Sequence, residues 1–237
     1  MAAHQPNEKK NENSYKQYST ATDVAPDRLH EKGDWDILYA SKVDCLRGKR
    51  AGRLLQYDPG TEKVSVLARN LSFANGVAVD KDEMYVVVAE TFAMTFTKVY
   101  LAGPKQGTTE TVIDSSQFTG AIDGVDCSWE SSGASAGKCY IVVPTEILPI
   151  LKMLQLLPHP FDYWIRFLLL MLPKWLTFNP TQYGCVVEVD METGATRTFQ
   201  DPDATEMEFL TGVTVHGDKL YLGSLHKDVV GIYDLSE

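Results

Sequence analysis

Two patterns of apolar and polar residues alternate along the chain. The first is a short apolar strand, an acidic or glycine turn, and a second strand that ends in a small or hydroxyl residue. It occurs at residues 21–42, 74–91, 122–146 and 210–227. The second is a strand, a turn rich in Asp, Pro or Gly, and another strand. It occurs at residues 52–67, 97–113, 184–199 and 229–235. Apolar residues alternate within each pattern, which is typical of β-strands, so each pair of patterns predicts two hairpins.

The hairpins repeat with a long and regular period. Asn75 and Asp123, which occupy like positions in two successive repeats, are about 48 residues apart, the length of a four-stranded propeller blade. The fold class predicted is therefore all-β, with about four blades of a β-propeller. A plain antiparallel β-sandwich is the alternative, and the long regular period counts against it.

Residues 147–179 interrupt the β pattern with a Leu-rich stretch. Its apolar residues have helical spacing, and Pro158 and Pro160 divide it into two predicted helices. Each is too short to cross a bilayer, which takes about 20 apolar residues. Three interpretations remain: an apolar cap over the propeller mouth, a helix pair that contacts a membrane surface through 147–176, and a true span. The cap is favoured because buried helices are the commoner use of such sequences.

The N-terminal segment and the net charge bear on the domain boundaries, the compartment and the partners of the chain. Residues 1–18 are polar, and we predict a disordered leader there, followed by a partial propeller over 19–237. The leader contains no apolar run that could serve as a signal-peptide core, so the sequence alone names no compartment. With 22 basic and 32 acidic residues the net charge is −10, which argues against nucleic acid as a partner.

The cysteines and one asparagine motif carry further expectations. The four cysteines include no CxxC pair, which argues against a zinc site. Cys127 and Cys139 could form a bridge, but two buried thiols are the favoured interpretation.

The motif Asn70-Leu71-Ser72 is an N-glycosylation acceptor only if the chain enters the secretory pathway.

Several motifs in a fixed order resemble one protein family. FANGVAV with VVVAET, then LAGPKQGT, YGCVVEVD after the Leu-rich insertion, and HGDKLYLGSL resemble the strictosidine synthase-like family from Thr20 to Leu235. The resemblance implies a six-bladed propeller, related to paraoxonases and gluconolactonase-type enzymes, whose N-terminal blades are missing here. It also implies an endomembrane location such as the endoplasmic reticulum. Four blades leave two open faces, so we expect a piece of a longer protein, with dimerisation through the open blades as the alternative.

The resemblance further implies a calcium ion on the propeller axis. Asn75 and Asp123 match the family's ligand positions and are of the right chemical type, because calcium prefers oxygen ligands. The preceding repeat offers only Thr20 or Thr22, and the acidic ligand of the first blade has no counterpart. The simpler interpretation is that both Asx-Gly pairs make tight turns.

Residues expected around a substrate mouth are Thr211, His226, Glu90, Trp164 and Phe167. Thr211 stands where the family's synthase has a catalytic glutamate, and a threonine hydroxyl cannot serve as that base near neutral pH. Strictosidine synthase activity is therefore disfavoured.

Two functions from different classes follow from these features. The first is a hydrolase of small apolar esters or lactones that uses an axial calcium ion. The second is a catalytically inactive propeller fragment that binds membrane or protein partners through its helical insertion.

Overall fold

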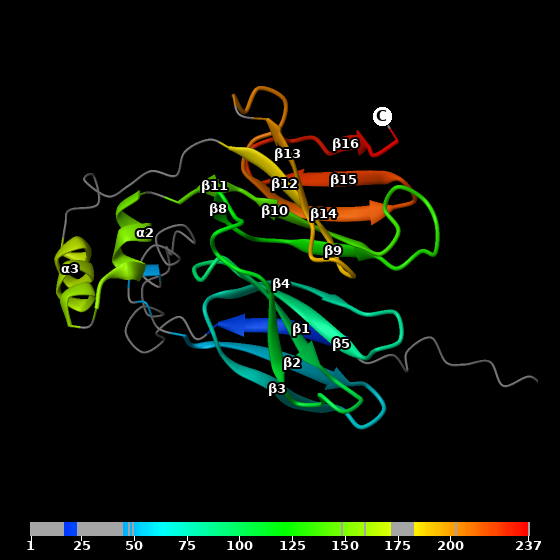
Figure 1. Ribbon diagram of the computed structural model, residues 1–237, viewed down its shortest axis with the longest axis horizontal. Helices are drawn as coiled ribbons and strands as arrows, with labels where there is room; N and C mark the ends of the chain where they lie inside the picture. The colour runs from blue at the N-terminus through cyan, green and yellow to red at the C-terminus, as the bar shows by residue number, and fades with distance from the viewer. Residues whose placement is uncertain are drawn as a thin grey trace, which may run out of the picture.

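The computed structural model describes residues 17–22, 45–46, 48, 50–147, 149–158, 160–171, 183–201 and 203–236. Its strands form separate antiparallel sheets, with two short helices to one side (Figure 1). The predicted first hairpin, 21–42, lies outside these residues apart from its first two positions. Most of the predicted leader also lies outside them.

The two middle sheets are complete four-stranded meanders, in which each strand pairs with the strands that come before and after it in the same sheet. We number the sheets as blades in chain order. The second blade consists of β4 (Ala74–Val79), β5 (Tyr85–Glu90), β6 (Thr95–Tyr100) and β7 (Thr109–Ile113). The third blade consists of β9 (Val125–Ser128), β10 (Lys138–Val143), β12 (Gly184–Asp190) and β13 (Thr196–Asp201).

The two outer sheets have three described strands each. The first blade consists of β1 (Gln17–Thr22), β2 (Gly52–Asp58) and β3 (Lys63–Leu71). The fourth blade consists of β14 (Leu210–His216), β15 (Lys219–Ser224) and β16 (Gly231–Asp234). The last two residues of the predicted leader, Gln17 and Tyr18, belong to β1. The Tyr18 ring packs on the core, and its hydroxyl accepts a hydrogen bond from Gln56 Nε2 at 3.1 Å.

The first strands of successive blades lie side by side. Strand β4 contacts β1 on one side and β9 on the other, and β9 in turn contacts β14. Sheets arranged as meanders, with neighbouring first strands packed around a common line, are blades of a propeller. The predicted all-β propeller class is therefore confirmed, and the sandwich alternative is not what the chain adopts.

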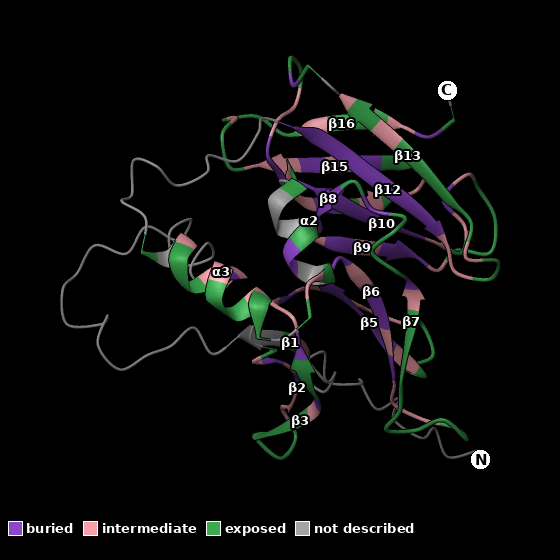
Figure 2. Cartoon of the chain, turned by 60° about the vertical axis from the view of Figure 1, so that its left-hand side comes forward, coloured by how far each residue is buried: buried purple, intermediate pink, exposed green. Residues whose placement is uncertain are grey.

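The core lies between the blades as three apolar layers. Along β5, Val86 and Val88 pack toward the first blade, whereas Val87 and Ala89 pack toward the third. All four side chains are fully buried, which explains why this strand reads as an unbroken apolar run. Figure 2 shows the same burial in the third blade, where β9, β10 and β12 are almost entirely purple. The outer blades differ: β3 leaves Val64 63% exposed because no described blade covers its other face.

A disulfide joins the first two strands of the third blade. The pairing register places Cys127 of β9 directly opposite Cys139 of β10, with their Cα atoms 4.0 Å apart. Both residues are buried, as expected, but the favoured interpretation of two thiols was wrong. The reason is the register, which makes the two cysteines cross-strand neighbours and so brings their sulfur atoms within bonding distance.

The insertion forms two helices, as predicted, and they break at the two prolines. Two short strands, β8 (Gly120–Ala121) and β11 (Thr145–Glu146), pair at its base. Helices α2 (Pro149–Leu156) and α3 (Phe161–Leu170) follow and stand beside the sheets at the left of Figure 1. Among the described residues, no helix is both long and apolar enough to cross a membrane.

Candidate functional site

Three residues at the beginnings of neighbouring inner strands come together at one end of the propeller. Asn75 is the second residue of β4, Asp123 precedes β9 by two residues, and Thr211 is the second residue of β14. The amide of Gly76 donates to the Asp123 carbonyl oxygen at 3.2 Å, which joins the second and third blades directly. The structure thus brings the two predicted calcium ligands together, with Thr211 in the next blade.

Two glycines make this approach possible. A Cβ atom on Gly76 would lie 2.6 Å from the backbone oxygen of Asp123. A Cβ atom on Gly124 would lie 2.5 Å from the backbone oxygen of Thr211. Real Cβ atoms do not come so close to backbone, so any larger residue would push the blades apart. The Asx-Gly pairs therefore do more than make turns, since they set the distance between blades at the axis.

The Asp123 carboxyl group has an altered acidity. Partial burial raises its pKa to about 6, while a hydrogen bond from the Asn75 side chain acts in the opposite direction. The Asn75 amide nitrogen also lies 3.4 Å from the Thr91 hydroxyl oxygen. Burial disfavours the ionised form of a carboxyl group, and a nearby positive charge favours it. A cation bound beside Asp123 would therefore be stabilised by the carboxylate.

The chemistry of these donors fits a hard cation in kind but not in number. Asn75 and Asp123 supply amide and carboxylate oxygens, whereas calcium takes about six to eight oxygen ligands. In the part of the chain that the structure describes, no group of three or more His, Cys, Asp or Glu side chains could hold a metal ion. Thr20 and Thr22, the weaker candidates from the preceding repeat, are strand residues of β1.

Glu90 has a different environment from the predicted one. Its side chain is only 3% exposed, and Oε2 accepts hydrogen bonds from Arg50 Nη2 at 2.8 Å and from the Ser72 amide at 2.6 Å. Oε1 accepts from the hydroxyls of Thr97 at 2.8 Å and Thr95 at 3.3 Å. The carboxylate therefore ties the second blade to the segments before β2 and after β3. This is a correction to its expected place at a substrate mouth.

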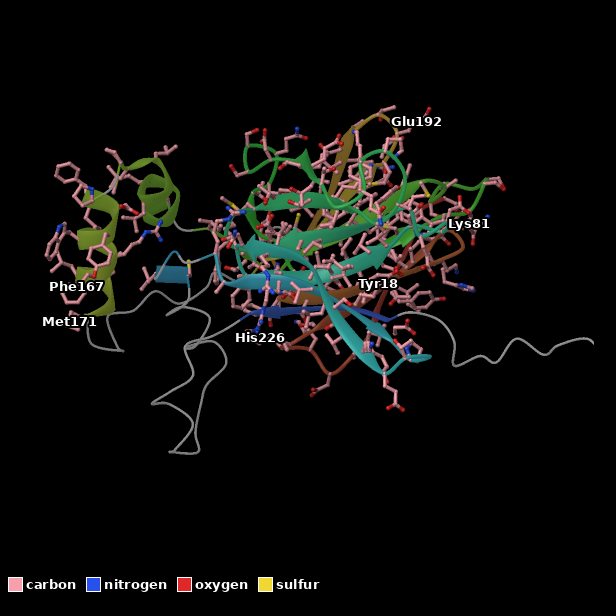
Figure 3. All side chains as sticks on the ribbon, turned by 90° about the horizontal axis from the view of Figure 1, so that it is seen from below. Tyr18, Lys81, Phe167, Met171, Glu192 and His226 are labelled. Atoms are coloured by element: carbon pink, nitrogen blue, oxygen red, sulfur yellow. A yellow bond between two sulfur atoms is a disulfide. The ribbon has the colours of Figure 1, made fainter. Side chains whose placement is uncertain are left out.

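Trp164 and Phe167 do not join the axial residues either. Both lie on α3, where they are 59% and 43% exposed. Figure 3 shows Phe167 and Met171 on the outer side of this helix, away from the sheets that carry His226. The side that faces the protein is polar: Arg166 Nη1 donates to the Cys45 carbonyl at 3.1 Å, and Arg166 Nε lies 3.6 Å from Asp162. The expected apolar cap is not formed by these two side chains.

His226 belongs to a small polar cluster at the same end of the fourth blade as Thr211. Its ring stacks on Phe209 with centroids 4.6 Å apart, and its Nδ1 lies 4.0 Å from Glu208 Oε2. Lys227 Nζ lies 4.0 Å from the other carboxylate oxygen. The Ser224 hydroxyl donates to the Glu208 carbonyl at 2.5 Å and accepts from the His226 amide at 3.0 Å, which connects the two loops.

Glu208 is the residue of this cluster that the sequence did not single out. Its side chain is 14% exposed, and Oε2 is buried without a hydrogen-bond partner. It lies outside the position that matches the synthase glutamate, so the resemblance did not select it. Its place two residues before an inner strand, opposite a histidine two residues after the next strand, is the signal that could have found it.

The fold and these axial residues define the class of the protein as a β-propeller with oxygen-bearing side chains near the beginnings of its inner strands. Residues 36–104 match the strictosidine synthase family. The adipocyte plasma membrane-associated protein of Salmo salar is 32% identical over 189 residues, which cover 78% of this chain and 43% of that protein. Strictosidine synthase-like protein 10 of Arabidopsis thaliana is 25% identical over 198 residues, which cover 80% and 49%.

The chain belongs to the strictosidine synthase-like family, as its motifs predicted. It spans less than half the length of the two relatives named above. Among solved structures, a gluconolactonase from Xanthomonas campestris is similar with a TM-score of 0.47 and 16% identity, covering 79% of this chain and 50% of that one. The calcium-binding protein regucalcin from Agrobacterium tumefaciens has a TM-score of 0.45 and 16% identity, covering 76% and 48%.

Proposed function

We propose that this chain carries part of the axial site of a calcium-assisted hydrolase that acts on small apolar esters or lactones. The observation that carries the proposal is the pairing of Asn75 with Asp123, whose carboxyl group is partly buried and has a pKa raised to about 6. A cation bound there would supply Lewis-acid polarisation of a substrate carbonyl. Family membership supports a propeller of this kind, and the oxygen-only donors support the choice of calcium.

The residues of this chain would have distinct tasks. Asp123 would hold the cation as a carboxylate, so binding should strengthen as the pH rises through about 6. His226 would accept the proton of the attacking water, and Glu208, 4.0 Å away, would orient its ring. Thr211 has no group that titrates near neutral pH, so we do not propose a synthase reaction that needs a base at that position.

Calcium binding is the first test, because it does not depend on knowing the substrate. Saturating calcium should raise the melting temperature of the full chain, since a ligand that binds only the folded state stabilises it by about 2.7 kcal/mol at 100 times its Kd. Asp123→Asn should abolish the shift. Asp203→Asn, which changes an exposed carboxylate in a loop, should keep it. No shift in the wild type at millimolar calcium would reject the proposal.

Hydrolysis is the second test. Wild-type protein and the variants Asp123→Asn and His226→Gln should be compared on an aryl acetate and on a γ-lactone, with calcium and with a chelator. We expect both variants to lose the calcium-dependent rate, and His226→Gln to keep the calcium-induced melting shift. Equal rates in His226→Gln and the wild type would remove the histidine from the mechanism without affecting the metal site.

A membrane-docking propeller is the second candidate function. Phe161, Trp164, Leu168 and Met171 form one stripe along α3 and are 64%, 59%, 62% and 67% exposed. None of them carries a charge, and aromatic residues on such a stripe favour the interface of a lipid bilayer.

Flotation with phosphatidylcholine–phosphatidylserine vesicles tests this docking. Wild-type protein should float, and Leu168→Asp should abolish flotation because it places a charge in the middle of the stripe. Gln106→Asp, in an exposed turn of the second blade, is the matched control and should float normally. Flotation that is indifferent to Leu168→Asp would remove this candidate.

A further inference from the structure

Near its end, strand β3 contains a bulge that leaves Asn70 exposed to solvent. Ala68 pairs with Leu54 and Leu71 pairs with Gly52, so three steps along β3 match two steps along β2. One extra residue is therefore accommodated at Arg69 and Asn70, and Asn70 takes it up with a φ of 61°. Asparagine tolerates this left-handed conformation better than most residues. Both residues of the bulge are exposed, although Ala68 and Leu71 on either side are buried.

The side chain of Asn70 is available for chemistry. It forms no hydrogen bond with any residue that the structure describes, whereas its backbone oxygen accepts one from Arg50 Nε at 2.7 Å. The backbone is therefore held while the amide group extends into solvent. Two residues later, the Ser72 amide donates to the buried Glu90 carboxylate, which keeps this segment in place beside β4.

Asn70, Leu71 and Ser72 form an Asn-X-Ser motif, the acceptor sequence for N-linked oligosaccharides. The sequence holds only one other Asn-X-Ser/Thr triplet, Asn179-Pro180-Thr181, and the proline at its middle position disqualifies it. Any N-linked modification of this chain must therefore fall on Asn70.

The disulfide in the third blade indicates where such a modification would occur. Disulfides such as the one between Cys127 and Cys139 form and persist in oxidising compartments. N-glycosylation takes place in compartments of this kind. We propose that Asn70 is an N-glycosylation site and that this propeller segment folds on the luminal side of an endomembrane. The bulge exposes the acceptor asparagine, and the bridge separately favours an oxidising compartment in which that asparagine could be modified.

The transfer itself needs a lipid-linked diphosphate oligosaccharide as donor. The Asn70 amide nitrogen forms a bond to C1 of the first sugar, and the bond from C1 to the phosphate oxygen breaks. The lipid diphosphate leaves with the electron pair of that bond, and the proton lost by the amide passes to a base of the transferase. No electron is exchanged, so the step requires no oxidant or reductant.

The test uses the full chain behind a cleavable signal sequence in cultured insect cells. Wild-type protein should migrate as a heavier form that peptide N-glycosidase converts to the unmodified mass, with Asn70 recovered as aspartate. Ser72→Ala should lose the heavier form. Ser72→Thr, which retains the motif, should keep it. Both serine variants leave the strained Asn70 backbone unchanged, which Asn70→Gln would not.

Two further measurements make every outcome decisive. Alkylation of free thiols reports whether the disulfide has formed, and Pro180→Ala opens the second triplet as an internal standard. An unmodified wild-type chain whose disulfide has formed would overturn the proposal, more so if Pro180→Ala is modified. An unmodified chain with both cysteines reduced would overturn it too, because the shared luminal setting would be wrong. Neither result bears on calcium binding, which is measured separately.

Discussion

Glu90 should contribute more to stability as a hydrogen-bond acceptor than as a charge. Its carboxylate accepts four hydrogen bonds, two at each oxygen. Its ionic partner Arg50 is 54% exposed, so water can replace that interaction, and exposed pairs contribute only about 0–1 kcal/mol. If the Glu90 carboxylate were removed, by contrast, the Ser72 amide and the Thr97 hydroxyl would lose their acceptor, and each unsatisfied buried group costs about 1–3 kcal/mol.

Two substitutions separate these contributions. In Glu90→Gln the amide oxygen can face the Ser72 amide while its nitrogen donates to the hydroxyls of Thr97 and Thr95, which rotate to accept. We expect a loss of about 1 kcal/mol in the free energy of unfolding. Glu90→Ala removes every acceptor and should cost about 2–6 kcal/mol, because two buried donors are left without a partner.

Urea unfolding followed by tryptophan fluorescence and by circular dichroism measures both free energies from the linear dependence on urea. Equal losses in the two variants would refute the reasoning, because they would assign the effect to the charge. An unchanged free energy of unfolding in Glu90→Ala would also refute the reasoning, since the hydrogen bonds would then contribute nothing.

Three other predictions concern the cross-link, the axial carboxyl group and the packing of the blades. Replacing Cys127 and Cys139 by serine together should cost about 3 kcal/mol, as expected for a short closed loop, and reduced wild-type protein should match the double variant in urea unfolding. The pKa of Asp123 is raised on folding from 3.8 to about 6, so the folded state binds the proton more tightly. Without calcium its contribution to stability should be fully present below pH 4 and fall as the pH rises to about 6; a series of melting temperatures over this window should show this decline in the wild type and not in Asp123→Asn. Gly124→Ala should destabilise by about 1–3 kcal/mol because its Cβ would meet a backbone oxygen at 2.5 Å, whereas Gly212→Ala, with open space around it, should be nearly neutral in the same melting assay.

Much of the site could be located from the sequence because propeller blades repeat. Asn75 and Asp123 occupy like positions in successive repeats, and a repeated position in a radial fold returns to the same axis. Glu208 could not be located in this way. Its neighbour His226 lies 18 positions further along the chain, and only the pairing of β14 with β15 brings the two loops together.

The failures share a cause. Glu90 ends its strand in a sequence that fits either a channel or a contact between blades, and the choice depends on Arg50, 40 positions earlier. Trp164 and Phe167 lie on an apolar helix whose burial depends on where the insertion rests. The outer placement of these two side chains follows from polar contacts of Arg166, which no local pattern encodes.

The sequence by itself determined the strands, the two helices, the repeat and hence the propeller class. These depend on side-chain periodicity and turn residues, which act over a few neighbouring positions. Only the tertiary structure decided the disulfide between Cys127 and Cys139, the burial of Glu90, the outward turn of Asn70 and the approach of the blades at Gly76 and Gly124. Each of these depends on register or on contact between segments distant in the chain, where a shift of one residue exchanges the buried and exposed faces of a strand.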